Sequence, residues 1–128
     1  MKPELITSPD APPPAGPYSP ALRVGELVYL AGQGGTDPAT GKLGETIEEQ
    51  TEQTLRNIAV LLAAAGCTFA DVVKVTVFLT DIDDRPLVNP VRQEAFGSSR
   101  PASTLVEVSA LVIPGARIEV DAVALIPS

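Results

Sequence analysis

The chain has 128 residues, of which 45% are hydrophobic, and its formal net charge is -7. This length fits one hydrophobic core and predicts a single domain spanning residues 1–128. The acidic balance disfavours binding to nucleic acid, because no cluster of Lys and Arg offsets it locally. No apolar run approaches the roughly 20 residues of a membrane span, and the N-terminus lacks the apolar core of a secretory signal. We therefore expect a cytoplasmic protein with no nucleic-acid or membrane partner.

Histidine is absent, and Cys67 is the only cysteine. These counts exclude an intrachain disulfide, the common zinc sites and His-dependent acid/base chemistry within one chain. Cys67 follows Gly66 at an expected helix end, and we interpret it as a small buried apolar residue rather than a nucleophile. Any chemistry must use carboxylates, hydroxyls, Arg, Lys, Tyr, backbone groups or water.

A proline-rich arm comes first in the chain. Residues 8–20 hold six of the 13 prolines, which excludes a regular helix and predicts an extended or turning segment that carries Tyr18. Residues 27–32 are typical of a buried strand that ends at a glycine, and residues 37–41 indicate a turn.

The strongest helix signal lies in residues 47–65. Thr46 and Glu49 form a capping-box pattern, in which each side chain satisfies a free N–H at the helix start. Apolar residues then recur at steps of three and four until Gly66 ends the helix. The alternating segment 71–81 predicts a strand covered by a helix on one face.

A second helix is expected around Leu87 to Phe96, although Pro90 lies inside this segment. Proline in a helix interior costs about 3 kcal/mol, so we expect Asn89 to cap the helix and Pro90 to occupy its first position. Two strands, 103–111 and 116–126, joined by a turn around residues 113–115, close the chain.

Strand alternation sorts the side chains of these last two segments onto faces. One face of the first carries Ser103, Leu105, Glu107 and Ser109, and one face of the second carries Arg117, Glu119, Asp121, Val123 and Leu125. The order of elements predicts an α+β fold with one mixed sheet and both helices on one face.

Six short motifs, in this order along the chain, resemble the Rid (reactive intermediate deaminase) family, also called YjgF-like or endoribonuclease L-PSP-like. They are GPYSPA (16–21), AGQ (31–33), KVTVFLTD (74–81), VN (88–89), RPAST (100–104) and RIEVDAVA (117–124). The resemblance implies a chorismate-mutase-like fold and a homotrimer that binds small molecules in clefts between subunits. It also implies cofactor-independent hydrolysis of enamines and imines, such as 2-aminoacrylate, to a 2-oxo acid and ammonia.

The resemblance further implies roles for individual residues. Glu119 holds the attacking water, Tyr18 is the tyrosine of the arm and Asn89 is the asparagine of the loop. Our candidate substrate-binding residues are Asn89, Ser103, Leu105 and Arg100. In deaminating members an Arg that clamps the substrate carboxylate follows Pro-Ala, and here that position is Ser103. We therefore expect weak or absent activity on carboxylate-bearing imines, and a gain from Ser103→Arg. Arg100 has a structural role on this interpretation, and its reach into a neighbouring cleft stays open.

Several alternatives remain at this point. Glu119 and Asp121 also fit solvated or paired surface carboxylates, and Tyr18 also fits a packing residue. Three functions stay open: an imine or enamine deaminase with altered specificity, a non-catalytic trimer that binds a metabolite or a partner protein, and a ribonuclease, which the charge disfavours. If the protein is a deaminase, we expect Glu119 to face the interface cleft and to hold a water near Tyr18 of an adjacent chain.

Overall fold

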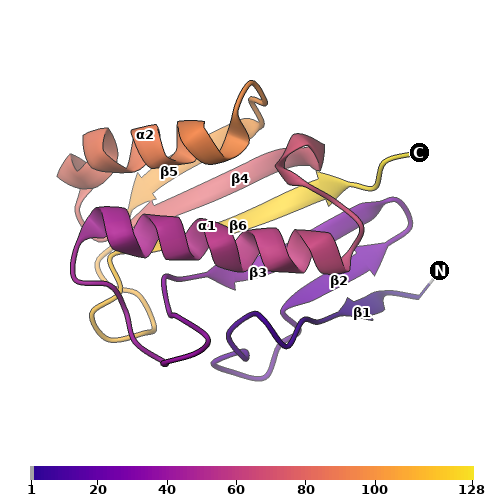
Figure 1. Ribbon diagram of the computed structural model, residues 1–128, viewed down its shortest axis with the longest axis horizontal. Coiled ribbons are helices and arrows are strands. Elements are labelled where there is room, and N and C mark those ends of the chain that lie inside the picture. The colour runs from indigo at the N-terminus through magenta and orange to yellow at the C-terminus, as the bar shows by residue number, and fades with distance from the viewer. Residues whose placement is uncertain (1) are drawn as a thin grey trace.

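The computed structural model describes residues 2–128 as one six-stranded mixed sheet with two α-helices packed on the same face (Figure 1). This is the α+β architecture that the order of elements predicts. The strand order is β1-β2-β3-β6-β4-β5. The elements are β1 (Glu4–Ile6), β2 (Ala21–Val24), β3 (Leu27–Gln33), α1 (Ile47–Ala64), the 3-10 helix η1 (Phe69–Asp71), β4 (Val72–Leu79), the 3-10 helix η2 (Ile82–Asp84), α2 (Arg85–Phe96), β5 (Ala102–Glu107) and β6 (Ile118–Leu125).

The last two strands are not neighbours in the sheet. β5 pairs in parallel with β4 at the sheet edge, whereas β6 lies between β3 and β4 and is antiparallel to both. β5 also ends at Glu107 rather than at residue 111, and β6 starts two residues later than predicted. A parallel pair requires a crossover, and α2 supplies it between β4 and β5.

α1 begins and ends close to the predicted positions. The Thr46 hydroxyl accepts a hydrogen bond from the Glu49 backbone N–H, as the capping pattern predicts. The expected return bond differs, because the Glu49 carboxylate accepts from the Thr46 hydroxyl rather than from its backbone N–H. The buried face of α1, which includes the fully buried Leu61 and Leu62, packs on the sheet.

α2 contradicts the predicted helix start. It begins at Arg85, four residues before Asn89, and Pro90 lies inside it. Pro86 occupies the first turn, where a missing N–H is harmless. The sequence argument weighed Pro90 alone, whereas the helix that starts at Arg85 buries the side chain of Val88 completely. Burying one such side chain contributes about 1.5–3 kcal/mol, which offsets much of the penalty.

The N-terminal region adds two strands that the sequence argument did not predict. β1 and β2 form an antiparallel extension of β3, and the proline-rich arm connects them. β3 itself is buried on one face only: Val28 and Leu30 are buried, while Tyr29 between them is exposed. The turn at residues 37–41 is confirmed by a hydrogen bond from the Gly41 N–H to the Asp37 carbonyl.

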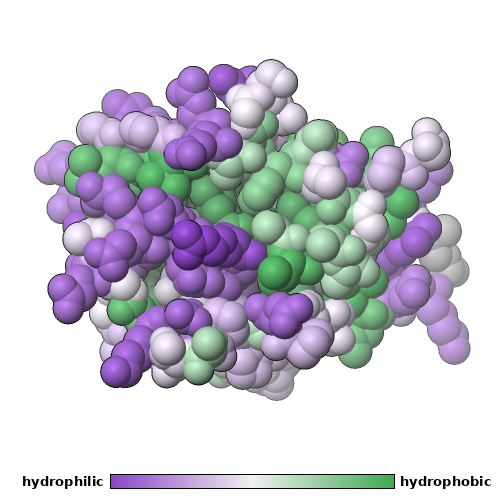
Figure 2. Space-filling view, in the orientation of Figure 1, coloured by the Kyte–Doolittle hydropathy of each residue, from purple (hydrophilic) through white to green (hydrophobic). Residues whose placement is uncertain are grey.

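The two faces of the sheet differ in polarity and cover. Val75, Val77 and Leu79 of β4 lie under the helices with almost no exposure. On the helix side of the molecule, apolar groups reach the surface between the two helices and polar side chains cover much of α1 (Figure 2).

Within residues 2–128, no helix combines the length and apolar character that crossing a membrane requires.

Cys67 is buried among the core residues, as predicted. Burial raises the pKa of its thiol, and Asp71 adds to this effect while Arg23 opposes it. A thiol kept protonated is a poor nucleophile, which agrees with a packing role.

Candidate functional site

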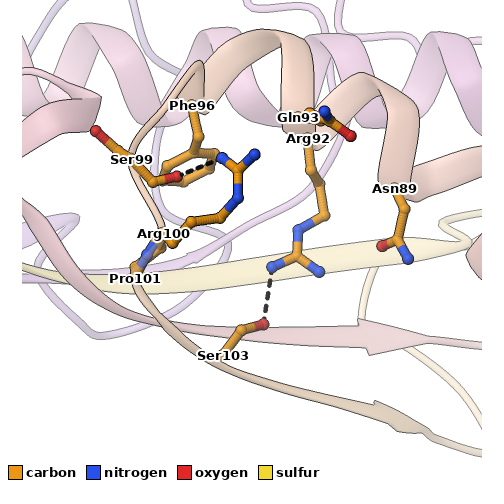
Figure 3. A pocket seen from close by; sticks show the side chains of 8 residues that line it. All are labelled: Asn89, Arg92, Gln93, Phe96, Ser99, Arg100, Pro101 and Ser103. Carbon is orange, nitrogen blue, oxygen red and sulfur yellow. Dashed lines mark hydrogen bonds between the residues drawn. The ribbon is translucent and has the colours of Figure 1, made fainter.

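A cavity of about 350 Å³ opens between the C-terminal half of α2 and the start of β5 (Figure 3). Two arginines belong to its wall, and no carboxylate does. The lining residues are Asn89, Arg92, Gln93, Phe96, Ser99, Arg100, Pro101 and Ser103. The cavity is thus a polar, cationic space of a size that suits a small molecule.

Arg92 and Ser103 meet at the centre of this cavity. Arg92 extends from α2 toward β5, and its Nη2 donates a 2.7 Å hydrogen bond to the Ser103 hydroxyl (Figure 3). Ser103 lies beside Val75 in the parallel β4–β5 pair, and since Val75 is buried beneath the helices, Ser103 faces them too. Residue 103 itself carries no charge, but the Arg92 guanidinium from α2 therefore lies next to it.

Arg100 belongs to the same wall but is held by its own loop. Its Nη1 donates to the carbonyl oxygens of Gly97 and Ser99, which stabilises the turn that follows α2. Gly97 has φ of 60°, a conformation that favours glycine, and it ends the helix. The structural role expected for Arg100 agrees with these bonds, although the residue also lines the cavity.

The other predicted binding residues divide between two places. Asn89 lines the cavity and projects from α2 toward β5 (Figure 3), as a residue inside the helix and not as its cap. Leu105 instead lines a separate depression near Ile82 and Arg85. Glu107, predicted to share a strand face with Ser103, accepts a hydrogen bond from the Ile82 N–H at the start of η2.

Glu119 lies on the opposite face of the sheet. Ile118 and Val120 are buried under the helices, so the alternation of β6 turns Glu119 away from them, as predicted. Burial raises the pKa of Glu119 above the usual glutamate range, and the neighbouring Asp121 carboxylate raises it further. A half-buried carboxylate with a raised pKa is the kind of group that acts as a general base near neutral pH.

Gly32 of β3 lines a recess together with Tyr18 and also packs against the Glu119 side chain. Tyr18 and Gly32 line a recess of about 40 Å³, which is enough for a water molecule. A Cβ on Gly32 would lie 2.7 Å from the Glu119 Cδ, so the carboxylate packs directly over this glycine. The Tyr18 hydroxyl accepts a hydrogen bond from the Ala15 N–H, which closes a turn in the arm.

Sequence reasoning missed Arg92. Its position is readable in retrospect, because Val88, Arg92 and Phe96 follow at steps of four and belong to one helix stripe. The prediction that Pro90 starts the helix leaves Val88 outside it, so this spacing was not recognised. Among residues 2–128, no group of three or more Cys, Asp or Glu side chains is arranged to hold a metal ion.

Comparison with known proteins shows the family to which the chain belongs. The sequence model of the family described as endoribonuclease L-PSP matches residues 8–126, which is nearly the whole chain. The chain belongs to the Rid family. The Rid resemblance read from the six motifs is therefore confirmed, and so is the fold.

Individual Rid proteins match over most of their length. The 2-iminobutanoate/2-iminopropanoate deaminase of Capra hircus is 46% identical and covers 94% of this chain and 88% of its own. A RutC family protein of Pyrococcus abyssi is also 46% identical, over 87% of this chain and 88% of its own. The crystal structure of RidA from an Antarctic Psychrobacter superposes with a TM-score of 0.93 at 38% identity, over 96% and 99% of the two chains.

Proposed function

We propose that this Rid protein is a deaminase that hydrolyses small reactive imines and enamines. Water adds to the imine carbon, the C–N bond breaks, and the products are a carbonyl compound and ammonia. The relatives named 2-iminobutanoate/2-iminopropanoate deaminase support this reaction class. The proposal places the reaction in the cytoplasm and requires no metal or organic cofactor, since a protonated imine is already electrophilic.

Glu119 is the observation that carries this proposal. Its half-buried carboxylate packs over Gly32, a residue that also lines a recess large enough for one water, and its raised pKa makes it a stronger base than an ordinary glutamate. An ionised Glu119 orients the water and accepts one of its protons as the C–O bond forms. Tyr18 of an adjacent chain contributes its hydroxyl near the same water.

A ligand that contacts both polar clusters, Arg92 with Ser103 and Glu119 with Gly32, requires more than one chain. Ser103 and Arg92 lie on the helix side of the sheet, whereas Glu119 lies on the other side. A small molecule can touch both only where the edge of one subunit meets the open sheet face of another. We propose that the chain forms a homotrimer with its ligand sites at these junctions.

The open face of the sheet supports this assembly. Tyr29, Val106 and Leu125 belong to that face and expose 47%, 38% and 44% of their surface. Large exposed apolar groups on one sheet face indicate contact with another subunit. Val73 lies at an irregularity in the β4–β6 pairing between Val72 and Lys74 and is also exposed.

Ser103 bears on which imines the enzyme accepts. A serine hydroxyl gives one neutral hydrogen bond, worth about 1 kcal/mol net, and a guanidinium gives charge-assisted bonds of roughly twice that strength. We propose that activity on carboxylate-bearing imines is altered and weaker than in members that carry an arginine at the position of Ser103.

The test is ammonia release from 2-aminoacrylate generated enzymatically in the presence of the purified protein. The proposal predicts a rate above that of the buffer, and absence of any rate on this compound and on imines without a carboxylate would refute it. RNA incubated with the same preparation is expected to remain intact, because a net charge of -7 repels a polyanion. Sedimentation at micromolar concentration checks the trimer, which a monomer would contradict.

A further inference from the structure

We propose that Arg92 is the anion-binding group of the α2–β5 cavity. Its guanidinium gives up the hydrogen bond to the Ser103 hydroxyl and binds the carboxylate of a small 2-oxo or 2-imino acid instead. The inference rests on the proposed function only for the choice of ligand. The site itself rests on the chemistry of the cavity wall.

The first step is the state of Arg92 in the structure. Its guanidinium is half-buried, and burial lowers its pKa because the charged form loses water. Buried charges are normally paired with an opposite charge. The ion pairs within residues 2–128 join Arg56 to Glu52 and Arg117 to Asp84, and neither involves Arg92. Its side-chain hydrogen bond goes to the neutral Ser103 hydroxyl.

The second step is what surrounds the guanidinium. No Asp or Glu belongs to the cavity wall, while Arg100 adds a second positive charge to it. Arg100 already donates to two carbonyl oxygens of its own loop, so Arg92 is the more available of the two. The field inside the cavity therefore favours an anion, and Arg92 is the group that can reach it directly.

The third step is the shape of the recognition. The planar guanidinium presents paired N–H donors that match the two oxygens of a carboxylate. Arg92 Nη2 is directed at Ser103, and Asn89, one turn earlier on α2, projects into the same space (Figure 3). A carboxylate that displaces the Ser103 hydroxyl exchanges one neutral hydrogen bond for a charge-assisted pair. Ser103 is thus the resting partner of Arg92 and not the principal ligand group.

The experiment is a binding titration of the full chain with 2-oxobutanoate, followed by NMR of the arginine side-chain N–H groups. The neutral 2-oxobutanamide serves as the probe of shape without charge. We expect the wild-type protein to bind the acid more tightly than the amide, and the affinity for the acid to fall with added salt. Arg92→Gln is expected to weaken binding of the acid by about 10- to 100-fold and to leave binding of the amide nearly unchanged.

Two further variants make the result specific. Arg56→Gln removes the same charge from an exposed position on α1, and it is expected to bind the acid like the wild type. Ser103→Ala frees Arg92 from its hydrogen bond and is expected to bind the acid more tightly. Spectra of each variant report whether it is folded, and Arg92→Lys provides a second test at this position, with binding between those of the wild type and Arg92→Gln.

Distinct results overturn the proposal. A wild type that binds neither probe, equal losses in Arg92→Gln and Arg56→Gln, or equal affinity for acid and amide each contradicts an anion site at Arg92. A loss in Ser103→Ala as large as that in Arg92→Gln contradicts the resting role of Ser103. Binding that depends on Arg92 without any ammonia release supports the anion site and refutes the deaminase function, so the two fail separately.

Discussion

The two polar clusters of this protein are built in different ways. On the open face of the sheet, Glu119 lies on the central strand β6, and Gly32 lies on the neighbouring β3 at an irregularity in their pairing, where the Glu119 side chain packs over it. In the α2–β5 cavity, Ser103 is on an edge strand and its partner Arg92 reaches it from a helix. The first arrangement is fixed by sheet geometry, whereas the second can change by substitution of single side chains. Chemistry is thus expected to reside on the sheet, and selectivity on the helix.

Replacing Glu119 tests the chemical side of this comparison and has the largest expected effect. Glu119→Gln keeps the shape and removes the base, so we expect kcat to fall by about 10²- to 10⁴-fold, the range typical of a positioned general base. Steady-state ammonia release with 2-aminoacrylate measures it. Glu48→Gln, an exposed change on α1, is the control. Full activity in Glu119→Gln would make Glu119 structural.

Replacing Ser103 tests the selective side. We expect Ser103→Arg to raise kcat/KM for carboxylate-bearing imines, because it adds a strand-borne guanidinium. The gain is expected to reach roughly 30- to 1000-fold in an Arg92→Gln background. The gain is expected to be smaller with Arg92 present. Arg92 Nη2 lies 2.7 Å from the Ser103 hydroxyl, so a second guanidinium introduced at residue 103 would be repelled by the first.

A double-mutant cycle over these two positions measures that repulsion. Additive effects on kcat/KM would show that Arg92 and residue 103 do not share a ligand, and they would separate the cavity from the reaction. Robust hydrolysis of 2-aminoacrylate by the wild type that persists in Arg92→Gln would show that neither position limits carboxylate recognition.

The same contrast explains how much the sequence could predict. Strand alternation alone placed Glu119 opposite Ile118 and Val120, because a period of two leaves only one other face. Thr46 and Gly66 located α1 for a similar local reason. The cavity could not be built in this way, since it depends on where α2 begins. That start was set by burial of Val88, a tertiary effect that outweighed the local preference against Pro90.

The topology was also beyond local patterns. The sequence predicted strands near residues 103–111 and 116–126 and treated them as joined by a turn. In the structure β6 is inserted between β3 and β4, so β5 is left at the edge. Non-local pairing is decided by packing of the whole sheet under α1 and α2. The missed strands β1 and β2 are short and half-exposed, and their signal was masked by the neighbouring prolines.

Gly32 offers a smaller and more selective perturbation of the open face. Gly32→Ala would place a methyl group against the end of the Glu119 side chain, which is flexible and can move aside. We expect kcat to fall by about 10-fold because the base is displaced, while the melting temperature changes little. Gly34→Ala is the matched comparison, since it also adds a methyl group to a residue that lines the recess, but its closest neighbour is at 3.8 Å and is not Glu119. Equal activities of the two variants would contradict the placement of Glu119.

Asp121 gives the smallest expected effect and tests the electrostatics of the base. Burial is the main cause of the raised pKa of Glu119, and the Asp121 carboxylate adds to it. Asp121→Asn is therefore expected to lower the pKa of Glu119 toward, but not into, the usual glutamate range.

Two measurements read this shift. The acid limb of kcat/KM, where Glu119 must be ionised, is expected to move to lower pH in Asp121→Asn. Stability should respond with a defined sign: the protonated Glu119 favours the folded state, so its contribution is complete below the unfolded glutamate pKa and disappears as the pH rises through the folded pKa. Asp121→Asn narrows that pH window, and denaturant titrations across it should show less loss of stability than in the wild type. An acid limb that stays in place while the window narrows would mean that Glu119 titrates as described but is not the base of the reaction.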